Sequence, residues 1–118
     1  MKTLVLGASE NPARYSNRAI KMLRSHGVEV VAVGNKEGQV GDVNIHKGET
    51  HYDEIDTITM YLGAKNQIAY YDYILALNPK RIIFNPGAEN KELARLAENA
   101  CINTIHACTL VMLSTNQY

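Results

Sequence analysis

The fold is decided by the stretch TLVLGASENPARYSNRAIKML, residues 3–23. Its first four residues are apolar or β-branched and have the length of a buried strand. The run ends at Gly7, a polar loop follows, and apolar residues then recur at the spacing of an amphipathic helix. A strand, a short turn and a helix predict the first half of a βαβ unit. The loop between them is the first candidate for a binding site.

The rest of the chain repeats this alternation. Apolar residues at helical spacing fill residues 19–23, 68–75 and 93–100. Short runs rich in β-branched residues predict six strands, at residues 3–6, 28–33, 43–45, 57–62, 81–84 and 103–105. We therefore predict an α/β fold: a three-layer, Rossmann-like, doubly wound and mainly parallel sheet. The expected strand order is 3-2-1-4-5-6, with the opening strand in the centre.

The segment 34–56 departs from the alternation. It contains one weak strand and polar, glycine-rich sequence where a crossover helix is expected. We predict that its connections are loops. Without a covering helix, Val43 and Ile45 would contribute to an exposed apolar surface, and this predicts a weak homodimer contact.

Composition limits the classes of function. The chain has 118 residues, 46% of them hydrophobic, which predicts a single domain over residues 1–118 with one core. Its 12 basic and 12 acidic residues cancel, so we expect neither nucleic-acid nor membrane binding. There is no signal peptide and no apolar run of ~18 residues, which favours a cytoplasmic location. Cys101 and Cys108 lack the spacing of a zinc site, which predicts buried, unpaired thiols.

The opening loop has the residues of a phosphate site. Gly7 allows a sharp turn, and the small Ala8 and Ser9 allow a ligand to approach the backbone. We predict that Ser16 and Asn17 cap the helix that follows. The free N–H groups and the dipole of such a helix start attract anions.

Two arginines flank the same turn. The guanidinium groups of Arg14 and Arg18 suit bidentate contacts with phosphate. Either one alone is better explained as a solvated surface charge. The presence of both beside a helix start favours a phosphate site.

The end of the second predicted strand indicates which nucleotide would fit. Nicotinamide-binding proteins place an acidic residue there to hold the ribose hydroxyls, whereas this chain has Lys36. A cation suits a ribose that carries a phosphate, as in NADP or coenzyme A, although Lys36 is equally well explained as an ordinary loop residue. The G-x-G-x-x-G fingerprint is absent, because Gly7 is the only glycine of the first loop.

A second turn is expected at the same edge of the sheet. Pro86 and Gly87 follow a predicted strand, and Glu89 and Asn90 open a helix. Two such turns can bracket one ligand, and Pro86 and Gly87 are therefore candidate binding residues. An ordinary connection between a strand and a helix remains the alternative.

Three blocks of sequence together resemble a known family: GASENPARYSNRAIKMLRSHGVEVVAVG, NPGAENKELARLAENACI and ACTLVMLSTNQY. They are similar to the small stand-alone coenzyme A-binding proteins, which are relatives of the nucleotide-binding domain of the succinyl-CoA synthetase α subunit. The resemblance implies a Rossmann-like fold with coenzyme A at the carboxyl edge of the sheet, and no established reaction for single-domain members. It also implies that Lys36 lies near the ribose phosphate and that the phosphate loop contains Gly7, Ala8, Ser9, Asn11, Arg14 and Ser16.

The chain departs from this family in two places. Related chains commonly have glycine at the position of Cys101, so a left-handed backbone there would cost about 1 kcal/mol or more. The end of the chain also lacks the charged Arg-Cys-Pro stretch of other members, which puts a transferred role for Cys108 in doubt.

No catalytic or metal-binding set emerges from the sequence. His106 and Cys108 invite a thiol–imidazole pair, but a core cysteine beside a half-exposed histidine explains them better. The other histidines lack metal-ligand spacing. We therefore predict a protein that binds coenzyme A or an acyl-coenzyme A as a sensor, carrier or partner subunit. The alternatives are a small NADP-dependent oxidoreductase and a regulatory subunit whose pocket is vestigial.

Overall fold

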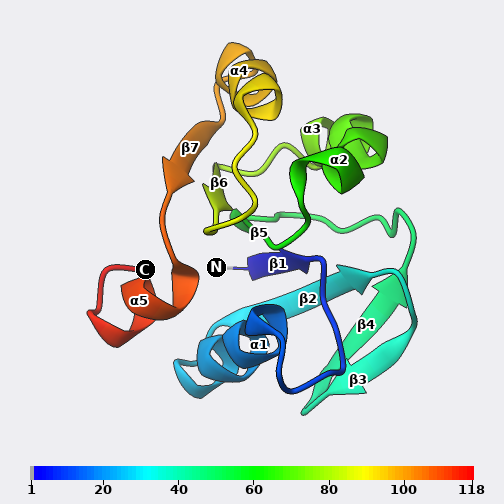
Figure 1. The fold of residues 1–118 in the computed structure, drawn as a ribbon, viewed down its shortest axis with the longest axis vertical. Helices are drawn as coiled ribbons and strands as arrows, with labels where there is room; N and C mark the ends of the chain where they lie inside the picture. The colour runs from blue at the N-terminus through cyan, green and yellow to red at the C-terminus, as the bar shows by residue number, and fades with distance from the viewer. Residues whose placement is uncertain (1) are drawn as a thin grey trace.

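The computed structural model describes residues 2–118 and shows a seven-stranded sheet between two layers of helices (Figure 1). The strand order is β3-β4-β2-β1-β5-β6-β7, and all pairings are parallel except that of β3 with β4. The three-layer α/β fold and the central position of the opening strand are confirmed. The strands are β1 (Lys2–Leu6), β2 (Glu29–Gly34), β3 (Gly38–Val40), β4 (Val43–Lys47), β5 (Thr57–Met60), β6 (Arg81–Phe84) and β7 (Asn103–His106).

The helices divide between the two faces of the sheet (Figure 1). Helices α1 (Tyr15–Ser25) and α5 (Thr109–Ser114) cover one face. The other face is covered by α2 (Ala64–Gln67), the 3₁₀ turn η1 (Ile68–Tyr70), α3 (Tyr71–Leu77) and α4 (Lys91–Asn99). The short helix α5 was not predicted. Among residues 2–118, the structure contains no helix with the length and apolar character that a membrane span requires.

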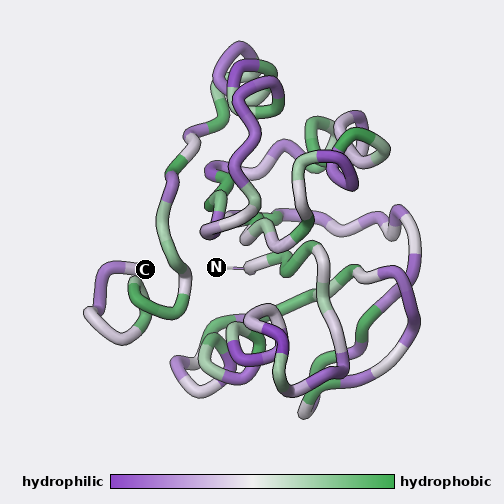
Figure 2. The backbone as a smooth tube through the Cα atoms, viewed as in Figure 1, coloured by the Kyte–Doolittle hydropathy of each residue, from purple (hydrophilic) through white to green (hydrophobic). Residues whose placement is uncertain are grey.

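Alternating side chains of β1 build a core on each face of the sheet. Leu4 and Leu6 pack with residues of α3 and α4, whereas Val5 packs with Ile20 of α1 and Leu113 of α5. Both faces of a central strand are thus buried, which explains why its sequence is a continuous apolar run. Figure 2 shows this pattern as green central strands, with helices that alternate between green and purple.

The segment 34–56 contains a β-hairpin, of which the second strand was predicted and the first, β3, was assigned to a loop. β3 pairs with β4 in antiparallel register, with Val40 opposite Val43, and Gly41 adopts the positive φ of 59° that the turn requires. Val43 and Ile45 are only 4% and 2% exposed and pack in the α1-side core. The expectation that they form an exposed surface is therefore wrong, and the homodimer prediction loses this basis.

Helix α1 begins earlier than predicted. Arg14 occupies the N-cap position without a side-chain cap, and the helix starts at Tyr15. Ser16 and Asn17 lie inside the first turn and are buried, so the prediction that they cap the helix is wrong. The chain turns sooner because the Asn11 side-chain oxygen accepts a hydrogen bond from the N–H of Ala13 at 3.0 Å.

The two cysteines differ from the predicted buried thiols. Cys101 follows α4 with a φ of 63°, so the position is left-handed and the cost expected for a residue other than glycine applies there. Its side chain is exposed, and Cys108 is only partly buried. The turn after α4 places Cys101 at the surface because a left-handed residue there directs the chain away from the helix and into β7.

Candidate ligand-binding site

A cavity of about 830 Å³ lies at the carboxyl ends of β1, β2, β5 and β6. Parallel strands that alternate with helices present their carboxyl ends on one edge, where open α/β sheets bind ligands. Four segments meet there: the loop from β1 into α1, the end of β2, the residues after β5, and the turn after β6. The lining consists of Leu6, Gly7, Ala8, Ser9, Ala13, Arg14, Tyr15, Ser16, Val33, Gly34, Asn35, Tyr61, Leu62, Gly63, Asn66, Tyr70, Pro86 and Gly87.

Two glycines allow the first loop to lie directly against its neighbours. The N–H groups of Gly7 and Ala8 both donate to the carbonyl oxygen of Val33, at 2.9 and 3.0 Å. A Cβ atom on Gly34 would lie 2.3 Å from the carbonyl oxygen of Ala8. Gly7 has a φ of 97°, which other residues rarely adopt. The first two N–H groups of the loop are therefore used within the fold, and an anion must be bound further along.

Other backbone donors remain available along this loop. Within residues 2–118, the N–H groups of Ser9, Glu10, Tyr15 and Ser16 have no hydrogen-bond acceptor. Tyr15 and Ser16 open an 11-residue helix, so the positive end of its dipole coincides with their two free donors. This combination favours the binding of a negatively charged group.

Arg14 places a positive charge beside these donors. It lines the cavity, and no acidic side chain of residues 2–118 forms an ion pair with it. Arg24, in contrast, is held by Asp42 at 2.8 Å. An unpaired guanidinium at a helix start can meet a phosphate without breaking an existing salt bridge.

Arg18 and Lys36 lie outside the lining. The Arg18 guanidinium lies 5.4 Å from the centre of the Tyr15 ring, in the range of a cation–π contact. Lys36 follows β2 by two residues and is exposed, while its neighbour Asn35 lines the cavity. Both cations are close in sequence to residues that line the cavity, but neither of them lines it.

The predicted site residues thus divide into two groups. Asn11 and Asn17 shape the loop from outside: Asn11 turns it, and the Asn17 side chain donates to the carbonyl oxygen of Ser9 at 3.0 Å. Arg18 and Lys36 are the other predicted residues outside the wall. The cavity brings together the remaining predicted residues, namely Gly7, Ala8, Ser9, Arg14, Ser16, Pro86 and Gly87.

The wall that follows β5 was not predicted from the sequence. Tyr61, Leu62 and Gly63 come directly after that strand, and Asn66 and Tyr70 come from the helical turns beyond it. A general signal was present, because the residues after every parallel strand reach the same edge of the sheet. No motif marks this segment, and only its position after a strand could have identified it.

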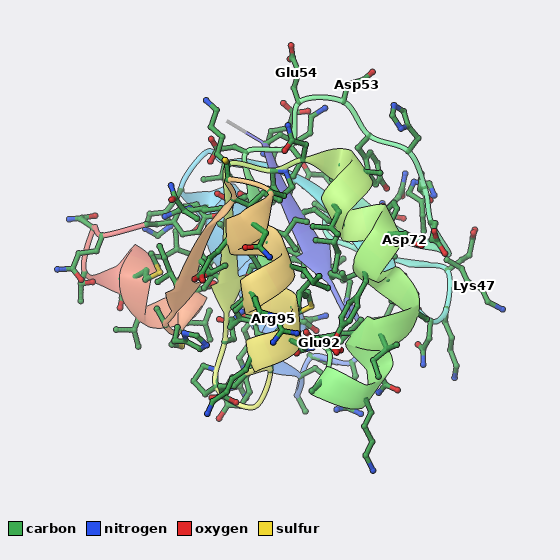
Figure 3. The ribbon with its side chains drawn as sticks, turned by 90° about the horizontal axis from the view of Figure 1, so that it is seen from above. Lys47, Asp53, Glu54, Asp72, Glu92 and Arg95 are labelled. Atoms are coloured by element: carbon green, nitrogen blue, oxygen red, sulfur yellow. The ribbon has the colours of Figure 1, made fainter. Side chains whose placement is uncertain are left out.

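A buried polar network fixes the wall beneath Pro86 and Gly87. The Gln67 side-chain amide donates to the carbonyl oxygens of Leu62 and Ala88, both at 2.8 Å. The Asn90 side chain donates to the Gln67 side-chain oxygen at 2.9 Å and caps α4 by accepting from the N–H of Leu93. The Asn90 side chain also donates to the Tyr71 hydroxyl, which in turn donates to the carboxylate of Glu92 at 3.0 Å. Glu92 belongs to α4 and faces the α2–α3 segment (Figure 3). These bonds join the residues after β5 to the turn after β6.

A second network lies under the cavity floor. The Asn85 side chain donates to the Thr59 hydroxyl and to the Met60 carbonyl, and accepts from the N–H of Thr109. Nearby, burial raises the pKa of Tyr61 to about 12. The Tyr61 hydroxyl has no hydrogen-bond partner among the residues that the structure describes. Tyr61 lines the cavity, and its hydroxyl is buried within the protein.

The thiol and imidazole groups near the end of β7 lie apart from the cavity. The His106 ring stacks on Phe84 with 5.4 Å between centroids, and neither His106 nor Cys108 lines the cavity. No group of three metal-ligating side chains occurs within residues 2–118. As far as residues 2–118 are concerned, the cavity wall contains no histidine, cysteine, carboxylate or lysine.

Comparison with known proteins identifies close structural relatives. Residues 1–114 match the model of a family described as a CoA binding domain. The crystal structure of an uncharacterized protein matches this one with a TM-score of 0.96, and the two sequences are 44% identical. The match covers 99% of this chain and 97% of that one. Curated proteins gave no match.

Two more distant structures share the fold alone. A Thermus thermophilus protein is 18% identical, with a TM-score of 0.86 over 99% of this chain and 90% of that one. The dinucleotide-forming acetyl-coenzyme A synthetase 1 of Ca. Korarchaeum cryptofilum is 16% identical, with a TM-score of 0.74. The match covers 90% of this chain but only 26% of the synthetase. The same architecture therefore occurs within a much longer enzyme.

Proposed function

This chain belongs to the CoA binding domain family, and from that premise we propose that the cavity at the carboxyl edge binds coenzyme A or an acyl-coenzyme A. One observation supports this most strongly. Two free N–H groups at the start of α1 and the unpaired guanidinium of Arg14 converge on an open cavity of about 830 Å³. The volume lies within the range of about 300–1,000 Å³ that is usual for ligand pockets.

In the proposed complex, each anionic part of coenzyme A meets a separate positive group. The diphosphate binds the N–H groups of Tyr15 and Ser16 and the side chain of Arg14. Lys36, which is exposed beyond β2, contacts the ribose 3′-phosphate. The methylene and methyl groups of the pantetheine chain lie against Leu62 and Tyr70 of the opposite wall.

We propose a binding role, as a sensor, carrier or partner subunit. The composition of the wall supports this role, because the described residues that line it offer neither a nucleophile with a neighbouring base nor a carboxylate.

Titration calorimetry with coenzyme A, acetyl-coenzyme A and NADPH tests the proposal. We expect one site that binds coenzyme A at micromolar concentration and NADPH at least about tenfold more weakly, a difference of about 1.4 kcal/mol. Binding of NADPH with no binding of coenzyme A below millimolar concentration would replace the proposal with the oxidoreductase alternative. If neither ligand binds, the cavity is vestigial.

A further inference from the structure

Glu10 joins two parts of the protein that are distant in sequence. It lies in the loop between β1 and α1, and its carboxylate accepts a hydrogen bond from the N–H of Gln39 in β3 at 2.8 Å. β3 is the last strand at its end of the sheet, so its outer side has no neighbouring strand to pair with. Glu10 therefore supplies an acceptor on the open side of this edge strand.

Gly38 makes this contact possible. A Cβ atom at position 38 would lie 2.4 Å from the carboxyl carbon of Glu10 and 2.6 Å from its Cγ. The Glu10 side chain thus lies directly over the Cα of Gly38, in space that any other residue would fill. The backbone of Gly38 lies outside the left-handed region, so its lack of a side chain matters here and its conformational freedom does not.

The contact connects the two positive groups of the proposed site. Arg14 lies on the same loop as Glu10, four residues further along, and Lys36 lies two residues before Gly38. Around Glu10, three hydrogen bonds hold the shape of the loop: the N–H of Asn11 donates to the Ser9 hydroxyl, the N–H of Ala13 to the Asn11 side-chain oxygen, and the Asn17 side-chain amide to the Ser9 carbonyl oxygen. Fixing the loop to β3 consequently fixes Arg14 relative to Lys36.

We infer that Glu10 is a positioning residue, which sets the separation of Arg14 and Lys36 so that one ligand with two separate anionic groups can contact both. This inference rests on the proposed function. A ligand that carries only the diphosphate needs Arg14 and the start of α1, and it gains nothing from the fixed separation. Glu10 therefore contributes to selectivity for coenzyme A over its dephosphorylated form.

Calorimetry with coenzyme A and dephospho-coenzyme A tests the inference. We expect Glu10→Ala to reduce the preference for coenzyme A about three- to tenfold, although it removes a negative charge that would otherwise repel both ligands. Glu10→Gln retains an oxygen that can accept from Gln39, and it should restore the preference of the wild-type protein. A general loosening of the loop would weaken the binding of both ligands by the same factor and leave the ratio of their affinities unchanged.

Gly38→Ala disrupts the same contact by changing its β3 residue, without substituting Glu10. Its Cβ displaces the Glu10 carboxylate, so this variant should lose the same preference. In the Glu10→Ala background, Gly38→Ala should have no further effect, because the group with which it clashes is gone. Equal ratios of affinity in the wild type and Glu10→Ala, or additive losses in the double variant, would overturn the inference while leaving coenzyme A binding established.

A measurement without ligand separates the two proposals. In Glu10→Ala, the amide of Gln39 should exchange its hydrogen with solvent faster than in the wild type, because its acceptor is missing. Unchanged exchange would refute the contact itself, whether or not coenzyme A binds. Faster exchange in a protein that fails to bind coenzyme A would refute the proposed function and, with it, the role of Glu10 in selectivity.

Discussion

Gly34 shows how a single residue determines the geometry of the site. A Cβ atom there would lie 2.3 Å from the Ala8 carbonyl oxygen, which is a backbone atom that cannot rotate away. We predict that Gly34→Ala lowers the free energy of unfolding by about 1–3 kcal/mol, as overpacked sites do. Gly63→Ala is the matched control, because its Cβ would have no neighbour within 4 Å. Urea unfolding of both variants checks this, and equal stabilities would contradict it.

Arg14 and Lys36 should affect two ligands differently. Loss of a charge-assisted hydrogen bond costs about 1.5–3 kcal/mol, or roughly ten- to a hundredfold in affinity. Arg14→Ala should lower the affinity for coenzyme A and for dephospho-coenzyme A by the same factor. Lys36→Ala should bind the two almost equally, because the wild-type preference depends on the 3′-phosphate.

The control for these two variants is Lys21→Ala, which removes an exposed charge from the middle of α1. It should leave both affinities within about twofold of the wild type. A wild-type protein that does not discriminate between the two ligands would refute the role given to Lys36. Equal effects of Lys21→Ala and Arg14→Ala would refute the role given to Arg14.

The raised pKa of Tyr61 should make the free energy of unfolding depend on pH under alkaline conditions. Its pKa is raised from 10 to about 12 by burial, so between these values the unfolded chain loses a proton that the folded chain keeps. The free energy of unfolding should therefore fall as the pH rises from 10 to 12. Tyr61→Phe should reduce this fall, and at pH 7 it should not destabilise, because the hydroxyl has no hydrogen-bond partner within residues 2–118. Denaturant unfolding of both proteins across this pH range measures the difference; parallel curves would contradict it.

At the scale of elements, the cap of α4 connects stability to the site. Asn90 caps the helix through Leu93 and also holds Gln67, which supports the wall after β5. We predict that Asn90→Ala lowers the free energy of unfolding by about 1–2 kcal/mol, whereas Lys91→Ala, one residue further along and exposed, changes it little. Thermal unfolding of the pair tests this. A Lys91→Ala variant as unstable as Asn90→Ala would show that the cap is not the cause.

The sequence predicts those elements whose signals are local. The apolar runs of the central strands and the Asn90 helix start are of this kind, and the structure confirms them. β3 is different, because Gly38–Val40 is short and becomes a strand only by pairing with β4. The start of α1 was misplaced for a similar reason. Two suitable capping residues, Ser16 and Asn17, are buried in the helix, while the turn at Asn11 determines where it begins.

At the scale of the whole molecule, the site is assembled from four segments that are far apart in sequence. The loop after β1 could be identified from its small residues and arginine. The wall at Tyr61, Leu62 and Gly63 was missed although the predicted strand order already placed its strand beside the opening one. Residues 57–62 were predicted as one strand, whereas β5 ends at Met60, so two of the wall residues were assigned to the sheet interior and not to its edge.

Binding of coenzyme A at the carboxyl edge of the sheet can be tested by an NMR titration of the ¹⁵N-labelled protein. We predict that coenzyme A shifts the backbone amide signals of the loop between β1 and α1 and of the opposite wall. The largest shifts should come from the free donors Ser9, Tyr15 and Ser16. Absence of shifts at millimolar coenzyme A would contradict binding at this edge. So would shifts confined to the smaller cavity of about 290 Å³ beside Glu49, His51 and Asp72.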